Sequence, residues 1–82
     1  MAEKSPGLLD TIIVTSDQPE YEVLAGDLGT IVEVYESPAL AYEIEFVNPN
    51  GTTRALLTLS PAQVRPLSEN DILTTRQIAL AV

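Results

Sequence analysis

Hydrophobic and polar residues alternate most regularly in the middle of the chain. Tyr42, Ile44 and Phe46 alternate with Glu43 and Glu45, at the period of two that a β-strand imposes. The pattern predicts a half-buried strand that turns its aromatic and aliphatic side chains to the core. Its other face is acidic and faces water.

Turn residues divide the rest of the chain into further short β-branched or apolar segments, which predict strands. We expect five strands, over residues 10–15, 28–35, 40–47, 53–59 and 64–67. A proline in the last segment indicates an edge strand. Residues 60–63 are expected to form one helical turn, because Ser60 suits its N-cap and Pro61 its first position.

Two glycines, Gly26 and Gly29, lead into the strongest predicted strand. Glycine reaches positive φ without steric cost, so we interpret both as structural turn residues. Gly29 would also permit a sharp bend or a close backbone approach. Gly51 follows Asn50 in another expected turn. A strand rather than a helix follows the first pair, which excludes a phosphate-binding loop.

A Gly-Asp-x-Gly turn before a β-branched strand is typical of small bent barrels of the SH3 and KOW type. We therefore predict an all-β fold, a small SH3-like partly open barrel over residues 10–67. Residues 1–9 are expected to be a flexible arm, and residues 68–82 a C-terminal extension. The expected core consists of Ile12, Val14, Leu24, Leu28, Val32, Val34, Tyr42, Ile44, Phe46, Ala55, Leu57 and Val64.

The amino-acid composition limits the kinds of catalytic and metal-binding site that the chain can form. The chain has 82 residues, enough for one domain, with no cysteine and no histidine. Disulfides, thiolate zinc sites and cysteine or histidine catalysis are therefore excluded. We expect no enzymatic activity, no catalytic or metal-binding residues and no cofactor.

The net charge limits the classes of molecule that the chain is expected to bind. Twelve acidic residues face four basic ones, for a net charge of −8. Nucleic acids and anionic membranes attract basic surfaces, so neither is an expected partner. The charge serves solubility in many acidic proteins. It also fits a basic protein partner, of which a toxin bound by an acidic antitoxin is one kind.

Acidic residues of the predicted sheet are the candidate partner-binding site. A solvated outer face is the ordinary interpretation of such residues. Paired carboxylates can also serve acid–base chemistry or hold a hard cation, and an acidic stripe can dock a basic protein. The candidates are Glu33, Glu36, Glu43 and Glu45, with Asp17, Glu20 and Tyr21 in the loop after the first strand.

Two neighbouring features have alternatives. Tyr21 either borders a peptide-binding groove or covers the core with its ring, which we favour because tyrosine often buries its ring. Arg54 follows the turn after the acidic strand and is expected to pair with Glu45.

The C-terminal extension is apolar at its end. Its pattern fits a helix or a strand equally well. It packs either on the barrel or against another copy through residues 72–82. The N-terminus has no signal-peptide pattern, and no apolar run reaches the roughly 20 residues of a membrane span. We therefore expect a cytoplasmic protein.

Residues 10–67 resemble a bacterial family of domains of unknown function numbered 4926. The resemblance rests on Asp17, Pro19, Glu20 and Tyr21, on residues 24–35 and 42–47, on Gly51, and on residues 55–59 and 64–67. It implies a small SH3-like barrel and no known reaction. The resemblance also suggests the acidic member of a two-gene pair of the toxin–antitoxin kind.

Overall fold

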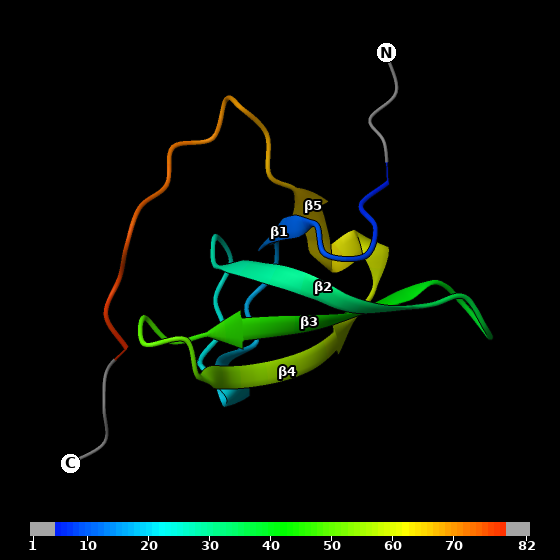
Figure 1. The fold of residues 1–82 in the computed structure, drawn as a ribbon, viewed down its shortest axis with the longest axis horizontal. Coiled ribbons are helices and arrows are strands. Elements are labelled where there is room, and N and C mark those ends of the chain that lie inside the picture. The colour runs from blue at the N-terminus through cyan, green and yellow to red at the C-terminus, as the bar shows by residue number, and fades with distance from the viewer. Residues whose placement is uncertain (1–4, 79–82) are drawn as a thin grey trace.

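The computed structural model describes residues 5–78 and places five strands in one sheet (Figure 1). The elements are β1 (Thr11–Val14), η1 (Pro19–Tyr21), β2 (Leu28–Tyr35), β3 (Ala41–Val47), β4 (Thr53–Leu59), η2 (Pro61–Gln63) and β5 (Val64–Pro66), where η marks a single 3₁₀ turn. The predicted strand boundaries agree with these to within a residue.

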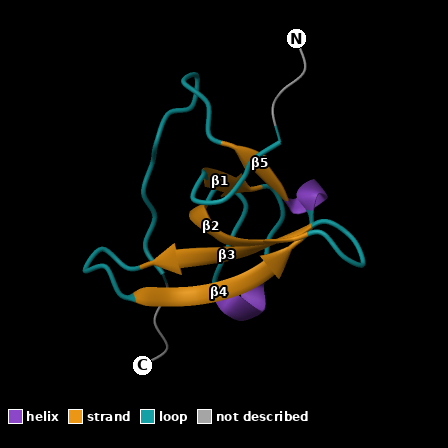
Figure 2. Ribbon diagram, turned by 45° about the vertical axis from the view of Figure 1, so that its right-hand side comes forward, coloured by secondary structure: helices purple, strands orange, loops and turns teal. Residues whose placement is uncertain are grey.

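All neighbouring strands pair antiparallel, in the order β4-β3-β2-β1-β5. The predicted all-β fold is confirmed, and the sheet is not closed into a barrel: β4 and β5 form its two edges. Long strands β2, β3 and β4 twist against one another, and β1 and β5 lie at the far side of β2 (Figure 2). Placing the proline-containing strand at an edge avoids the loss of a ladder hydrogen bond.

Local sequence explains the short turns. In η2, the Ser60 backbone N–H donates to Oε1 of Gln63 at 2.9 Å, and the Gln63 N–H donates back to the Ser60 carbonyl at 3.0 Å. This reciprocal contact satisfies donors that a helical turn leaves unpaired. Between β3 and β4, Gly51 has φ of 90° and donates to the Asn48 carbonyl at 2.9 Å. Gly26, at φ of 98°, occupies the predicted turn before β2.

The core differs from the prediction in β2. Leu28 is 40% exposed and Val32 is only half-buried, whereas Ile31 is fully buried. The cause is a β-bulge: Ile31 pairs with Ile44, but Glu33 pairs with Glu43, so Val32 is an extra residue. Inward positions are odd-numbered before the bulge and even-numbered after it. A single alternation therefore could not assign both halves of the strand.

Outside β2 most of the predicted core is confirmed. Leu24 is the exception, because it is only half-buried and its neighbour Val23 takes the place in the core. Val34 and Ala55 pack against the core from its margin. The buried cluster consists of Ile12, Val14, Val23, Ile31, Tyr42, Ile44, Phe46, Leu57, Leu59 and Val64.

Gly29 is not a turn residue. It lies inside β2, opposite Ile12, and its backbone faces the core. A Cβ atom at this position would overlap Cγ2 of Ile44 and lie 2.9 Å from Cε1 of Phe46. The expected close approach is confirmed, and it is made by side chains of β3 packing against the bare backbone of β2.

The C-terminal extension has neither helix nor strand over residues 68–78. It leaves β5, arches away from the sheet and returns toward the end of the β3–β4 hairpin (Figure 1). Ile72 is 88% exposed and Leu73 is 64% exposed. Residues 79–82, the rest of the predicted oligomerisation segment, and residues 1–4 of the predicted arm lie outside the described residues. Within residues 5–78, no helix is long and apolar enough to cross a membrane.

Candidate functional site

One face of the β2–β3–β4 sheet points away from the core, and we call it the outer face. Register places Glu45 beside Thr30 on one side and Leu56 on the other, and Val47 beside Thr53. Directly paired residues share a face of the sheet. The outer face therefore carries Leu28, Thr30, Glu33, Tyr35, Ala41, Glu43, Glu45, Val47, Thr53, Leu56 and Thr58.

Three of the predicted acidic residues gather on this face. Glu33 of β2 lies directly opposite Glu43 of β3, and Glu45 follows two residues later on β3. Threonines of β4 hold the two β3 carboxylates: Thr58 Oγ1 donates to Glu43 Oε1, and Thr53 Oγ1 donates to Glu45 Oε2, both at 2.5 Å. These bonds orient the carboxylates without neutralising them.

Opposed glutamates reduce the stability of the sheet, which gives a first prediction. Like charges directly opposite each other are destabilising. Replacing Glu33 by glutamine should therefore raise the free energy of unfolding by about 0.2–1 kcal/mol at low salt. Urea unfolding measures the change, and the gain should shrink in high salt. Glu69→Gln, in the exposed segment after β5, is the control; an equal gain there would assign the effect to net charge alone.

The remaining predicted site residues lie elsewhere. Glu36 follows the end of β2 in the loop to β3. Asp17 has a structural role, because its Oδ1 accepts a hydrogen bond from the Ala25 N–H at 2.8 Å. Glu20 and Tyr21 belong to η1.

Tyr21 does not cover the core as favoured from the sequence. The 3₁₀ turn carries it outside the sheet, where 51% of the residue is exposed. There it lines a hollow of about 350 Å³ together with Gln18 and residues 56–59 of β4. Leu56 and Thr58 of this hollow also belong to the outer face, and Thr58 holds Glu43, so Tyr21 lies beside the β4 edge of that face.

Arg54 does not pair with Glu45. The register of β3 with β4 shifts between Phe46 and Val47, so that Arg54 is the extra residue of a second bulge. Bulges redirect side chains. Here the Arg54 guanidinium donates from Nη1 to the Glu22 carbonyl at 2.9 Å, and its Nη2 lies 4.0 Å from Oδ2 of Asp27.

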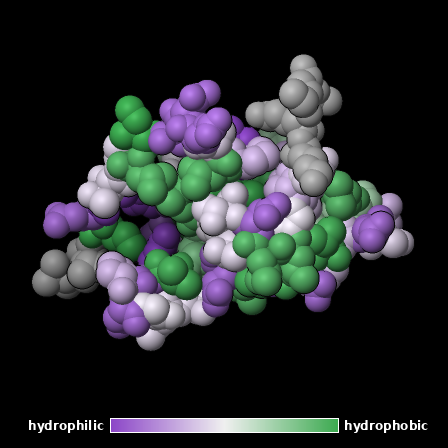
Figure 3. All heavy atoms as spheres, turned by 45° about the horizontal axis from the view of Figure 1, so that its top comes forward, coloured by the Kyte–Doolittle hydropathy of each residue, from purple (hydrophilic) through white to green (hydrophobic). Residues whose placement is uncertain are grey.

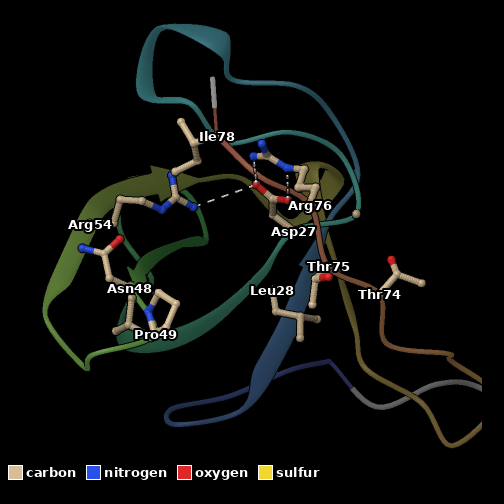
Figure 4. Close-up of a pocket in the computed structure, with 11 residues that line it drawn as sticks. Asp27, Leu28, Asn48, Pro49, Arg54, Thr74, Thr75, Arg76 and Ile78 are labelled. Atoms are coloured by element: carbon tan, nitrogen blue, oxygen red, sulfur yellow. Dashed lines mark hydrogen bonds and ion pairs between the residues drawn. The ribbon is translucent and has the colours of Figure 1, made fainter. Parts of the chain in front are cut away.

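Asp27 is the centre of the best-defined polar cluster (Figure 4). Arg76 Nε donates to Asp27 Oδ1 at 2.8 Å, and Arg76 Nη2 donates to Asp27 Oδ2 at 2.5 Å and to the Glu22 carbonyl at 2.9 Å. The Leu24 N–H donates to Oδ2 at 2.9 Å and fixes the carboxylate. Fork-like pairs of this kind are the strong form of an arginine–carboxylate contact.

A second arginine–aspartate pair holds the other end of the extension. Arg65 of β5 donates from Nη1 and Nη2 to the two carboxylate oxygens of Asp71, at 3.0 and 2.7 Å. The Ser68 N–H also donates to Asp71 Oδ2, at 2.8 Å. We call residues 71–78 the strap. The Arg65–Asp71 pair anchors its beginning, and the Arg76–Asp27 pair anchors it near its end.

Hollows remain beneath the strap. One, of about 320 Å³, is lined by Leu28, Val47, Asn48, Pro49, Arg54 and strap residues 74–76 and 78, among others. Another, of about 160 Å³, lies between Ile13, Leu28, Arg65 and residues 71–74. Figure 3 shows the surface of this side of the molecule, hollowed to the left of centre between hydrophobic and hydrophilic patches. The strap thus lies over one end of the outer face and does not fill the hollows between them.

The two aspartates make the strap sensitive to acid. Partial burial of the Asp27 carboxyl opposes its ionisation, but hydrogen bonds from Arg76 and Leu24 outweigh this and lower its pKa from 3.8. The hydrogen bond from Arg65, and that from the Ser68 N–H, lower the pKa of Asp71 far below the same value. A carboxyl with a lowered pKa in the folded state stabilises the fold above its unfolded pKa.

A second prediction follows for acid. The strap contacts should persist from neutral pH to about pH 4 and be lost as the pH falls through the lowered pKa values of Asp27 and Asp71. The Nε–Hε resonance of Arg76, followed by NMR, reports on the contact directly. It should hold its position down to about pH 4 and then move to that of a solvent-exposed arginine. A midpoint well above pH 5 would contradict this assignment.

Carboxylates in the part of the chain that the structure describes do not form a group of three suited to a metal ion. The outer-face glutamates are spread along two strands, and two of them are engaged by threonine hydroxyls.

Sequence reasoning missed the Asp27 cluster. Arg76 and Asp27 are 49 residues apart, and their contact depends on the path of a segment without regular structure. Glu22 contributes its backbone carbonyl, which accepts a hydrogen bond from Arg76. The Glu22 backbone has φ of 59°, a left-handed conformation that no sequence motif predicts. The only available signal was that three of the four basic residues, Arg54, Arg65 and Arg76, follow the acidic strand.

The fold defines a small antiparallel β domain with an acidic outer face and a clasped C-terminal strap. The model of a family described as a domain of unknown function, DUF4926, matches residues 8–66, and the chain belongs to this family. No curated protein and no solved structure matches the chain. The matched region contains Asp27 and all five strands, whereas the strap lies beyond it.

Proposed function

We propose that the protein is a non-enzymatic binding module whose outer face docks a basic protein partner. One observation carries the proposal: glutamates and exposed apolar side chains share a single open sheet face. Glu33 and Glu43 are held opposite each other, and Leu56, next to Glu45 in the register, is 53% exposed. Apolar side chains surrounded by charged ones are typical of protein interfaces.

Charge selects the partner in this proposal. The chain has a net charge of −8, and its outer face carries carboxylates but no basic residue among the positions assigned to it. A basic partner would be attracted from solution and would relieve the repulsion between Glu33 and Glu43. An antitoxin or immunity protein that covers a basic surface of a toxin would act in this way.

Co-purification from the native host, with a tagged full chain in low salt, supplies the partner. The partner recovered in stoichiometric amount is then titrated against the pure protein. Raising NaCl from about 50 to about 500 mM should weaken binding at least tenfold, because salt screens exposed charges. Binding that does not change with salt would remove the electrostatic basis of the proposal.

A pair of matched variants locates the surface. Glu43→Gln with Glu45→Gln keeps the threonine hydrogen bonds possible and removes two charges from the outer face. Asp10→Asn with Glu69→Gln removes two charges elsewhere. We expect at least about tenfold weaker binding for the first pair and less than about twofold for the second, since charge effects between exposed groups are local. Equal losses would assign binding to net charge rather than to this face.

A second candidate function is a structural subunit that joins an assembly through its extension. The exposure of Ile72 and Leu73 favours it. Replacing both by serine should abolish the association in that case and leave binding through the outer face intact. The glutamine pair should have the opposite effects, so the two functions are distinguished in one experiment.

A further inference from the structure

The strap is attached by a few polar contacts rather than by packing. Its anchors are the Arg65–Asp71 and Arg76–Asp27 pairs, while Ile72 and Leu73 face solvent and hollows lie below. No strap residue belongs to the buried core. Because none of its side chains is part of the core cluster, the segment can be released by breaking these two anchors without unpacking the core.

The receptor for Arg76 is built independently of the strap. Asp27 lies in the turn before β2, where the Val14 N–H donates to its carbonyl and the Leu24 N–H to its carboxylate. The Asp27 side chain is 14% exposed. The Glu22 carbonyl completes the receptor, and the Glu22 backbone is held by its own N–H bond to the Pro19 carbonyl. Asp27 and Glu22 both belong to the region that matches the family, whereas Arg76 lies beyond it.

The receptor is also continuous with the outer face. Leu28 of the outer face lies beside Asp27 and Arg76 in the same hollow (Figure 4). Val47 of the outer face lines that hollow as well. A partner docked on the outer face would therefore meet the strap at this end. It would also meet a fixed carboxylate already occupied by a guanidinium.

We propose that the Asp27 carboxylate and the Glu22 carbonyl form an arginine-binding site that the chain's own Arg76 fills and that an arginine of the basic partner takes over. The identity of the competitor rests on the proposed function. The arginine site itself rests only on the contacts described above. The strap is thus an internal competitor, and partner binding requires its release.

The arginine site is tested first, with a peptide. The probe is an acetylated and amidated peptide of residues 72–78, titrated by NMR into the full chain carrying Arg76→Gln. The backbone amide signals of Leu24 and Asp27 should shift and saturate. If the strap is closed in about nine molecules of ten, the wild-type chain should bind the probe about tenfold more weakly, because only the open fraction is competent.

Two controls isolate the guanidinium charge and its receptor. A peptide with citrulline at the arginine position keeps N–H donors and loses the charge, and it should not saturate. Asp27→Asn added to Arg76→Gln keeps an acceptor for the Leu24 N–H and should abolish binding of the arginine peptide. The proposed site would be overturned if the arginine and citrulline peptides bound equally well. It would also be overturned if the wild-type and Arg76→Gln chains had equal affinity for the arginine peptide, or if the shifts were confined to residues other than Leu24 and Asp27.

The competition is tested next, with the co-purified basic partner. Arg76→Gln should bind it several-fold more tightly than the wild-type chain, and Glu69→Gln should not. Unchanged affinity, with peptide binding observed, would refute the competition while the arginine site stands. If no basic partner binds the protein at all, the proposed function fails, and the peptide result is unaffected.

Discussion

Gly29→Val should destabilise the protein by about 3 kcal/mol, near the upper end of what overpacking a core costs. Even a single carbon at this position would overlap Cγ2 of Ile44, and Phe46 lies 2.9 Å from the same point. Both neighbours are fully buried and lie on β3, an interior strand of the sheet, so neither can move aside without disturbing the core. A domain of this size has a total stability of about 4–12 kcal/mol, and the loss is a large part of it.

Chemical unfolding followed by circular dichroism measures this loss. Thr30→Val is the matched control, because it introduces the same side chain at the next position of β2, on the outer face. Its effect should stay within about 0.5 kcal/mol. Gly29→Ala should cost less in a chain that already carries Ile44→Ala, since the overlapping methyl is then absent. Wild-type stability of Gly29→Val would mean that β2 and β3 do not approach as described.

Ile44→Ala should have the second large effect, a loss of about 2–5 kcal/mol. Ile44 is fully buried, and it pairs with Ile31 on one side and with Leu57 on the other. Removing its side chain leaves a cavity at the middle of the sheet, where neighbours on both sides are held by strand pairing. Where the variant does not fold, Ile44→Val should still show a loss of about 0.5–1.5 kcal/mol.

Leu56→Ala is the informative comparison for that variant. Leu56 lies on the neighbouring strand but on the outer face, and half of it is already exposed. Its replacement should change stability by no more than about 0.5 kcal/mol. In the proposed function it should nevertheless weaken binding of the basic partner. Core and surface roles thus separate: one substitution affects unfolding and the other affects binding.

Period-two patterning was sufficient to predict most of this fold. In β3 it assigned Tyr42, Ile44 and Phe46 to the core and Glu43 and Glu45 to the outer face, because the extra residues of both bulges lie on the neighbouring strands and not on β3. Turn residues located the strand ends, since Asn50-Gly51 and Ser60-Pro61 form turns through their own backbone preferences. These are local effects, and a sequence carries them directly.

Features that depend on a single extra residue or on distant contacts were not predicted. Val32 and Arg54 are each an ordinary strand residue by type, and nothing in their neighbours marks them as bulges. The face of Leu28 and the partner of Arg54 were assigned wrongly for that reason. The pairing of Asp27 with Arg76 depends on the path of the strap, which follows from tertiary contacts rather than local pattern.

The bulge at Val32 divides β2 into two halves with opposite alternation. Odd-numbered residues face the core before Val32, and even-numbered residues face it afterwards. A residue inserted or removed on either side would turn one half of the strand inside out, and it would expose either Ile31 or Val34. Related chains can therefore vary in length only in the loops that flank the strand. An alignment of such chains should keep this segment free of gaps, and the residue at position 32 is its natural reference mark.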